Sequence, residues 1–101
     1  MGSEVRIPFL WEWKDRMLEG KKTATSRSRL YGKAGDRFQC FGATFEIVSW
    51  EMLTLEDIAY NHFKEEGVDC PADFKAVWAR LHPSGFKPDK EVVFHKFKRV
   101  Q

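Results

Sequence analysis

One short stretch of the chain, Gly20-Lys21-Lys22-Thr23-Ala24-Thr25-Ser26-Arg27, concentrates side chains that could do chemistry. Its eight residues include three cations and three hydroxyl groups. Moving an unpaired ammonium or guanidinium group out of water is costly, so these side chains cannot simply be buried. The stretch is therefore either a solvated edge strand or the wall of a cleft that receives an anionic or acceptor-rich ligand.

Two arginines in and after this stretch, Arg27 and Arg29, are suited to phosphate, because a guanidinium group donates two parallel hydrogen bonds to phosphate oxygens. Lys21, Lys33 and Arg37 could extend the same path along the chain. Scattered cations are also common on surfaces that bind no phosphate. Both interpretations stay open from the sequence alone.

Aromatic side chains could stack on a nucleobase. Trp11, off the main helical stripe, and Tyr31, in an expected loop, are the two candidates for such stacking. Trp13, Trp50 and Trp78 fall at periodic apolar positions and are expected to pack in the core.

Charge is polarised along the chain, although the formal net charge is only +2. Residues 21–37 carry six cations against one aspartate, whereas residues 46–73 carry eight carboxylates against one lysine. A basic segment facing an acidic one would orient a charged ligand.

The elements that must position these side chains follow from apolar periodicity and from turn residues. Gly20 is placed to end the first helix in a left-handed turn, and a change of apolar face after Ile47 predicts a β-bulge. Thr54 is the expected N-cap of the second helix and Gly67 its end. In chain order the expected elements are an extended strand over 7–9, an apolar helix over 10–18, a strand over 23–27, a turn-rich connection over 31–36, strands over 38–41 and 43–53, a helix from 55, a helix from Pro71 that stops before Pro83, and a strand over 91–100.

This order predicts an α+β fold, with a small curled or barrel-like β-sheet and helices packed around it. Apolar periodicity alone does not distinguish a β-barrel from an open sheet. With 101 residues, the chain is expected to form a single domain over 1–101. Cys40 and Cys70 have no metal-ligand spacing and are expected to be reduced thiols. No metal, cofactor or membrane span is expected, and we expect a cytoplasmic, monomeric protein.

The ordered motifs resemble the ASCH domain. The resemblance rests on Gly20-Lys21-Lys22-Thr23 after an apolar helix and on Gly32-Lys33-Ala34-Gly35-Asp36 before a strand. It rests also on Glu65-Glu66-Gly67, followed by a helix that carries Trp78 and ends at His82-Pro83. This resemblance implies a fold like that of the PUA domain and a role in RNA metabolism, with the ligand in a cleft beside the barrel.

One branch of the ASCH family hydrolyses the acetyl amide of N(4)-acetylcytidine with a lysine, a threonine and a glutamate. Lys22, Thr25 and Glu66 match these residues, so the resemblance implies a base, a nucleophile and an acid, respectively. A desolvated lysine can accept the hydroxyl proton that makes threonine nucleophilic, and a carboxylic acid can protonate the leaving amine. Other members are thought to bind RNA without catalysis, or to cut it as ribonucleases do.

A structural interpretation competes with this one: Lys22 and Glu66 could form a salt bridge between strand and helix, and Thr25 could simply favour the strand. Alternation in a regular strand would also point Lys22 and Thr25 to opposite faces. We therefore predict that Lys22 lies in the helix-to-strand turn, before regular pleating begins.

Overall fold

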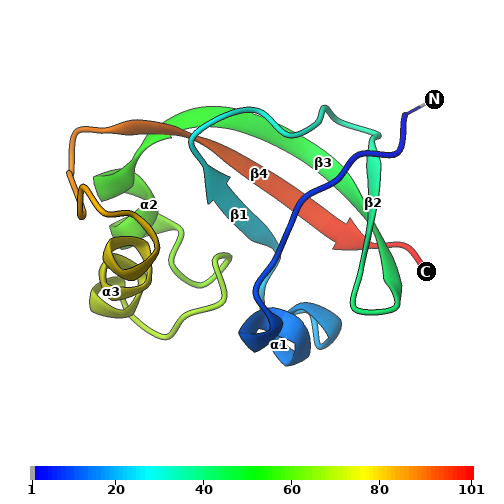
Figure 1. The fold of residues 1–101 in the computed structure, drawn as a ribbon, viewed down its shortest axis with the longest axis horizontal. Coiled ribbons are helices and arrows are strands. Elements are labelled where there is room, and N and C mark those ends of the chain that lie inside the picture. Colours follow the sequence, from blue (N-terminus) through cyan, green and yellow to red (C-terminus); the bar gives the residue numbers. More distant parts are fainter. Residues whose placement is uncertain (1) are drawn as a thin grey trace.

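A computed structural model describes residues 2–101, and its centre is a four-stranded antiparallel sheet in the order β1-β4-β3-β2 (Figure 1). The strands are β1 (Ala24–Arg27), β2 (Arg37–Cys40), β3 (Ala43–Thr54) and β4 (Glu91–Arg99). The α+β class is confirmed. The expected curled sheet is a four-stranded half-barrel. Closure into a barrel is not seen among residues 2–101, because β1 and β2 are the two outer strands and do not pair with each other.

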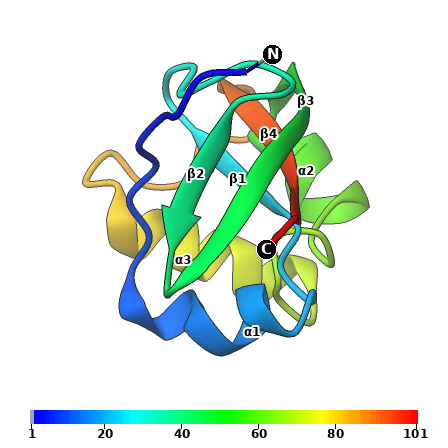
Figure 2. The same ribbon diagram turned by 90° about the vertical axis from the view of Figure 1, so that its right-hand side faces the viewer.

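The helices cover one side and one end of this sheet. They are a 3-10 turn η1 (Trp11–Trp13) that continues into α1 (Lys14–Leu18), then α2 (Leu55–Asn61) and α3 (Pro71–Leu81). Figure 2 shows β2 and β3 in front, with α1 below them and α3 behind. The Thr54 hydroxyl caps α2 by accepting a hydrogen bond from Asp57 N–H at 3.1 Å, as expected. This helix ends at Asn61, earlier than expected, and the chain then turns to Gly67.

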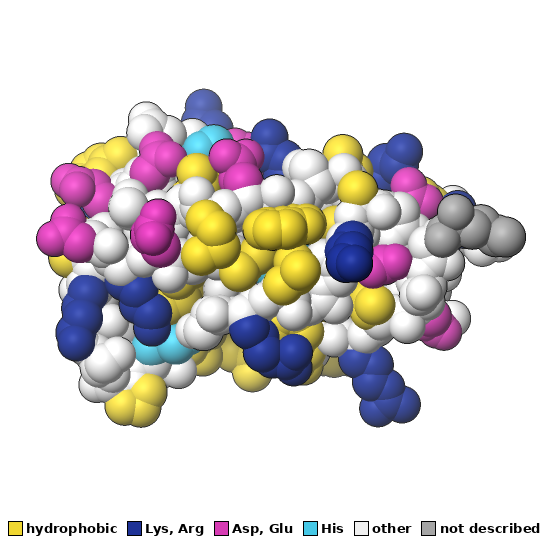
Figure 3. Space-filling model, turned by 90° about the horizontal axis from the view of Figure 1, so that it is seen from above, with side chains coloured by type: hydrophobic (Ala, Val, Ile, Leu, Met, Phe, Trp, Pro, Cys, Tyr) yellow, Lys and Arg dark blue, Asp and Glu magenta, His cyan; other side chains and the backbone are white. Residues whose placement is uncertain are grey.

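The long strand β3 carries the expected bulge, since its register against β4 shifts between Ile47 and Ser49. The bulge leaves Val48, Trp50 and Met52 on the solvent side, with Trp50 42% exposed. The prediction that Trp50 packs in the core is therefore wrong. Seen from above, hydrophobic side chains gather in the middle of this face between charged ones (Figure 3).

The core is rich in aromatic rings. Phe38, Phe45 and Phe97 pack against one another with ring centroids 5.4 to 5.5 Å apart. His95 of β4 is also buried, and its Nε2 accepts a hydrogen bond from Tyr31 N–H at 3.1 Å. That bond ties the long loop after β1 to the sheet, so the core fixes both strand β1 and the loop that follows it.

Candidate functional site

A pocket of about 510 Å³ lies between the outer edge of β1, helix α3 and the segment that leads into η1. Three kinds of side chain line it: aromatic rings, aliphatic groups and a compact polar cluster. The size suits a small molecule or one nucleoside. The lining residues are Pro8, Phe9, Leu10, Trp13, Lys22, Thr25, Ser26, Arg27, Ser28, Arg29, Tyr31, Glu66, Val68, Phe74, Val77, Trp78, Leu81 and His82.

Two backbone segments position the polar cluster. Gly20, with φ of +79°, ends α1 and turns the chain, and the N–H of Lys22 bonds to Arg16 O at 2.9 Å. The N–H groups of Thr23 and Ala24 both donate to Glu65 O, at 2.8 and 2.9 Å. The entry to β1 is thereby fixed against the segment that carries Glu66.

Lys22 lies just before β1, which begins at Ala24, so its predicted place in the helix-to-strand turn is confirmed. Lys22 is 3% exposed, and its ammonium group donates to Ala24 O at 2.8 Å, to Glu66 O at 2.9 Å and to Glu66 Oε1 at 3.3 Å. The Trp13 ring also lies 4.6 Å from Nζ. Burial lowers the pKa of Lys22 and the neighbouring Glu66 carboxylate opposes that change.

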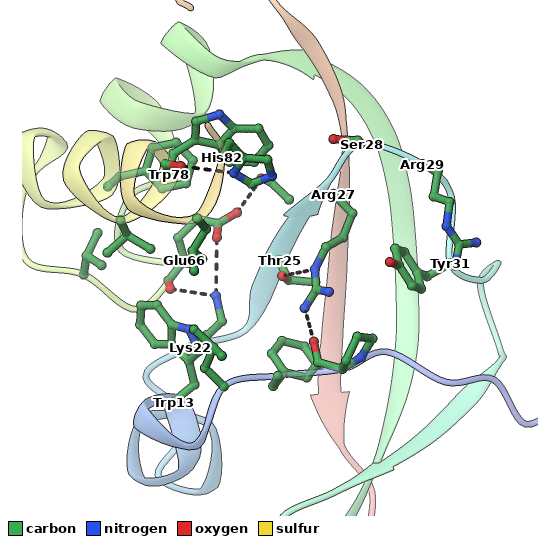
Figure 4. A pocket seen from close by; sticks show the side chains of 18 residues that line it. Trp13, Lys22, Thr25, Arg27, Ser28, Arg29, Tyr31, Glu66, Trp78 and His82 are labelled. Atoms are coloured by element: carbon green, nitrogen blue, oxygen red, sulfur yellow. Dashed lines mark hydrogen bonds and ion pairs between the residues drawn. The ribbon is translucent and has the colours of Figure 1, made fainter. Parts of the chain in front are cut away.

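The carboxylate of Glu66 has a second partner. Ser26 Oγ donates to Glu66 Oε2 at 2.6 Å, and Glu66 is only 5% exposed. Figure 4 shows Lys22 and Glu66 pointing toward each other beneath the Trp78 and His82 rings. A buried amine and a buried carboxylate therefore share one hydrogen-bonded unit at the pocket wall.

Thr25 lines the same pocket but turns its hydroxyl to a different partner. Arg27 Nε donates to Thr25 Oγ1 at 3.0 Å, and Arg27 Nη2 donates to Pro8 O at 2.6 Å. A guanidinium group that donates to a hydroxyl oxygen stabilises negative charge developing there. Lys22, Thr25 and Glu66 all face one cavity, although in this structure no hydrogen bond links Thr25 Oγ1 to Lys22 Nζ among the described residues.

Aromatic and cationic groups form the rest of the wall. The Arg29 guanidinium lies 4.1 Å from the Tyr31 ring centroid, and Arg27 lies 4.8 Å from that of Phe9. On the α3 side, the Trp78 and His82 rings are stacked with centroids 3.7 Å apart. His82 Nδ1 is 3.0 Å from Trp78 O, which closes the end of α3.

Four of the residues predicted to bind RNA lie outside this pocket lining. Lys21 is exposed and pairs with Glu19 at 3.4 Å, and Arg37 pairs with Glu46 at 3.2 Å. Trp11 is 72% exposed and packs edge-on against a neighbouring ring. The fourth residue is Lys33, which lies exposed in the loop before β2. Of the predicted set, Arg27, Arg29 and Tyr31 reach the pocket.

Residues that the sequence did not single out complete the site: Ser26, Trp13, Trp78 and His82. Alternation along the strand places Ser26 on the same face as Lys22, and this pattern could have predicted that Ser26 belongs to the polar cluster. The two tryptophans occupy apolar helical positions that look like ordinary core. Only the fold reveals that the core there opens into a cavity.

Within residues 2–101, no three His, Cys, Asp or Glu side chains gather as a metal ion would require. None of the helices described is long and apolar enough to cross a membrane.

No family model matches the chain, and no curated protein does. An ASCH domain from Lactobacillus crispatus JV V101 has a similar structure, with a TM-score of 0.63 over 97% of this chain and 79% of that chain, at 17% sequence identity. The fold is ASCH-like.

Two further solved structures share this ASCH-like fold. Protein EF3133 from Enterococcus faecalis V583, assigned to DUF984, matches with a TM-score of 0.68 over 99% of this chain and 76% of that chain, at 20% identity. A hypothetical protein, PH0355, matches with a TM-score of 0.71 over 99% of this chain and all of that chain (100%), at 15% identity.

Proposed function

We propose that the pocket binds a cytidine nucleoside of RNA and hydrolyses an acyl amide on its exocyclic amine, with N(4)-acetylcytidine as the reference substrate. One observation carries the proposal: a buried lysine and a buried carboxylate, 3.3 Å apart, share the wall of a nucleoside-sized pocket with aromatic rings and arginines. Groups with perturbed pKa values in a cavity are typical of catalytic sites. The ASCH-like fold is consistent with this role.

The aromatic walls supply binding. Trp13, Trp78 and Tyr31 offer flat surfaces on which a base stacks with little dependence on sequence. Arg29 is exposed beside Tyr31 at the pocket, where its guanidinium group is free to meet a phosphate. A nucleoside in an RNA strand is thus held by its base inside and by its phosphate at the entrance.

The polar cluster supplies the chemistry. The Lys22 ammonium, whose pKa is lowered by burial, first passes a proton to the Glu66 carboxylate 3.3 Å away. The neutral amine then accepts the hydroxyl proton of Thr25 as Oγ1 attacks the acyl carbonyl carbon. Collapse of the tetrahedral adduct breaks the bond to N4, and Glu66 gives the proton that it received from Lys22 to the departing amine. Water then attacks the acyl-Thr25 ester, with Glu66 taking the water proton and Lys22 returning a proton to Oγ1. The products are cytidine and the carboxylic acid.

This scheme assigns supporting roles to two neighbours. Arg27 donates to Thr25 Oγ1 and stabilises the alkoxide as it forms. Ser26 is a positioning residue, because its hydroxyl holds one carboxylate oxygen of Glu66. Reaction also requires Lys22 to exchange one of its three acceptors for the Thr25 hydroxyl.

Because catalysis needs Lys22 to give up one of its acceptors, a second candidate function is also favoured, namely RNA binding without catalysis. An ammonium group has three N–H donors, and all three donors of Lys22 have protein acceptors. A lysine satisfied in this way is also what a purely structural ion pair would contain. In this alternative the same pocket binds the base and no bond is broken.

Incubation with N(4)-acetylcytidine, followed by chromatography for cytidine, separates the two functions. The enzyme reading expects cytidine from the wild type, none from Thr25→Ala, and about 10²- to 10⁴-fold slower release from Lys22→Ala. Thr23→Ala is the matched control, since Thr23 lies in the same segment but outside the pocket lining. No turnover by the wild type, or turnover unaffected in Thr25→Ala, removes the catalytic proposal.

A further inference from the structure

Strand β1 is an outer strand, so one of its edges is not paired with another strand. On that edge, main-chain N–H and C=O groups point away from the sheet and need other partners. The bond from Phe97 N–H to Thr23 O, at 2.9 Å, fixes which residues these are. With the observed register, Thr25 and Arg27 turn their main-chain groups toward β4, and Ala24 and Ser26 turn theirs to the outer edge.

The outward groups of Ala24 are both satisfied. Its N–H donates to Glu65 O at 2.9 Å, and its carbonyl accepts from Lys22 Nζ at 2.8 Å. Ser26 is the next residue to face the same way. Among residues 2–101, no hydrogen bond of the backbone or of a side chain satisfies the main-chain N–H and C=O of Ser26 on this edge.

This edge faces the pocket. Ser26 is one of the residues that line it, and α3 forms the wall beyond the edge of β1 (Figure 4). The Ser26 hydroxyl is held by Glu66 at 2.6 Å, so the polar cluster and the open main-chain groups belong to one residue. A flat ligand that enters between Trp13, Trp78 and Tyr31 therefore meets a donor and an acceptor side by side.

We propose that the main-chain N–H and C=O of Ser26 read the Watson–Crick edge of the base, and that this edge favours cytosine over uracil. This inference rests on the proposed function and specifies its substrate class. In an extended strand, the N–H and C=O of one residue point the same way and bind a complementary donor and acceptor pair. Cytosine presents such a pair, because its N4–H donor lies beside the N3 acceptor. Acylation of N4 leaves one N–H, so the acylated base keeps the pair.

The same geometry rejects other pyrimidine edges. In the pose that places the exocyclic N4 amine at the Ser26 carbonyl, uracil carries an acceptor, O4, in place of that amine and a donor at N3, so both contacts with Ser26 are mismatched. In 3-methylcytidine the N3 acceptor is blocked. A site with buried polar groups discriminates strongly against a ligand that leaves them unpaired. We expect each of these nucleosides to bind about 10- to 100-fold more weakly than cytidine.

Hydrogen exchange of backbone amides, followed by NMR on the whole isotope-labelled chain, tests this inference. In the free protein the Ser26 amide is expected to exchange at least about tenfold faster than those of Thr25 and Arg27, which pair with β4. Saturation with cytidine is expected to slow exchange at Ser26 and leave the other two unchanged. Uridine and 3-methylcytidine serve as matched control ligands.

The outcomes separate this inference from the proposed function. If the Ser26 amide of the free protein exchanges as slowly as the Thr25 amide, the inference is overturned, since the outer edge of β1 would then be closed. Cytidine that shifts the indole signals of Trp13 and Trp78 without protecting Ser26 also overturns it, while nucleoside binding stands. Equal affinity for cytidine and 3-methylcytidine would likewise overturn the inference and leave nucleoside binding standing. If none of the nucleosides shifts a pocket signal, the proposed function and this inference both fail.

Discussion

Replacing Gly67 by alanine is expected to disturb the site through Lys22. Gly67 has φ of +88°, and a Cβ placed on it would lie 2.7 Å from Lys22 Cβ and 3.2 Å from Lys22 Cγ. Real carbon atoms do not approach so closely, so either Lys22 or the turn that carries Glu66 must move. Gly20 provides a matched control: its φ is +79°, and an added Cβ there would meet nothing within 4 Å.

The two substitutions share one cost and differ in another. Placing an L-residue at a left-handed backbone position costs about 1–2 kcal/mol, and both variants incur it. Overpacking a buried site adds about 1–3 kcal/mol, which only Gly67→Ala incurs. The expected losses in unfolding free energy are therefore about 1–2 kcal/mol for Gly20→Ala and about 2–5 kcal/mol for Gly67→Ala. The larger loss is a substantial part of the roughly 5–15 kcal/mol that holds a typical domain folded.

Urea denaturation followed by tryptophan fluorescence measures both losses, since the chain has four tryptophans. Gly67→Ala should also weaken cytidine binding, because it displaces Lys22 at the pocket wall. Equal losses for the two variants, to within about 0.5 kcal/mol, would refute the close packing of Gly67 on Lys22 and with it the described placement of the cluster.

Three further predictions concern the ion pair, the buried histidine and the exposed arginine. Lys22→Met leaves the buried Glu66 carboxylate without its cation and should cost about 3–5 kcal/mol, whereas Lys22→Met with Glu66→Gln should cost less. Urea denaturation of Lys22→Met, Glu66→Gln and the double variant checks this, and losses that add would show that the two residues are not coupled. Burial lowers the pKa of His95, so the unfolded chain binds its proton first as pH falls below about 6.5, and stability should fall there by up to about 1.4 kcal/mol per pH unit. His95→Gln should flatten that slope in urea midpoints measured from about pH 7.5 to pH 5, and an unchanged slope would assign it to other groups. Arg29→Ala should lower by about 1 the slope of the logarithm of the RNA oligonucleotide binding constant against the logarithm of salt concentration, measured by fluorescence anisotropy. Lys64→Ala is the control, since Lys64 is an exposed cation outside the pocket lining, and it should leave the slope unchanged. Equal slopes for the two variants would mean that Arg29 contacts no phosphate.

Local patterns predicted most of the elements because local forces set their ends. Thr54 caps α2, Pro71 opens α3 and Gly20 turns the chain, and each of these effects acts within a few residues. The helix from Leu55 was expected to run to Gly67, but it ends at Asn61. Its remaining turn holds Glu66 at β1, which is a long-range contact that helical periodicity cannot report.

The exposure of Trp50 is a second feature that local sequence patterns could not predict, because it depends on tertiary packing. Apolar periodicity identified β3 and its bulge, yet it did not tell which face would be covered. Which face of β3 is covered depends on where α2, α3 and the loop after β1 pack. The sequence pattern gives the period of a strand, and packing decides which side is buried.

From the amino-acid sequence alone followed the α+β class, the place of Lys22 before regular pleating, and the element order apart from the expected strand over 7–9, which does not form. These features could be predicted because turn chemistry and periodicity act over short distances. Tertiary structure alone decided that Lys22, Ser26 and Glu66 share a buried hydrogen-bonded unit. It also decided that the sheet stays open at β1. These are long-range outcomes, because β1 pairs with β4, which lies far along the chain, and the bonds of Lys22 and Ser26 to Glu66 span 44 and 40 positions.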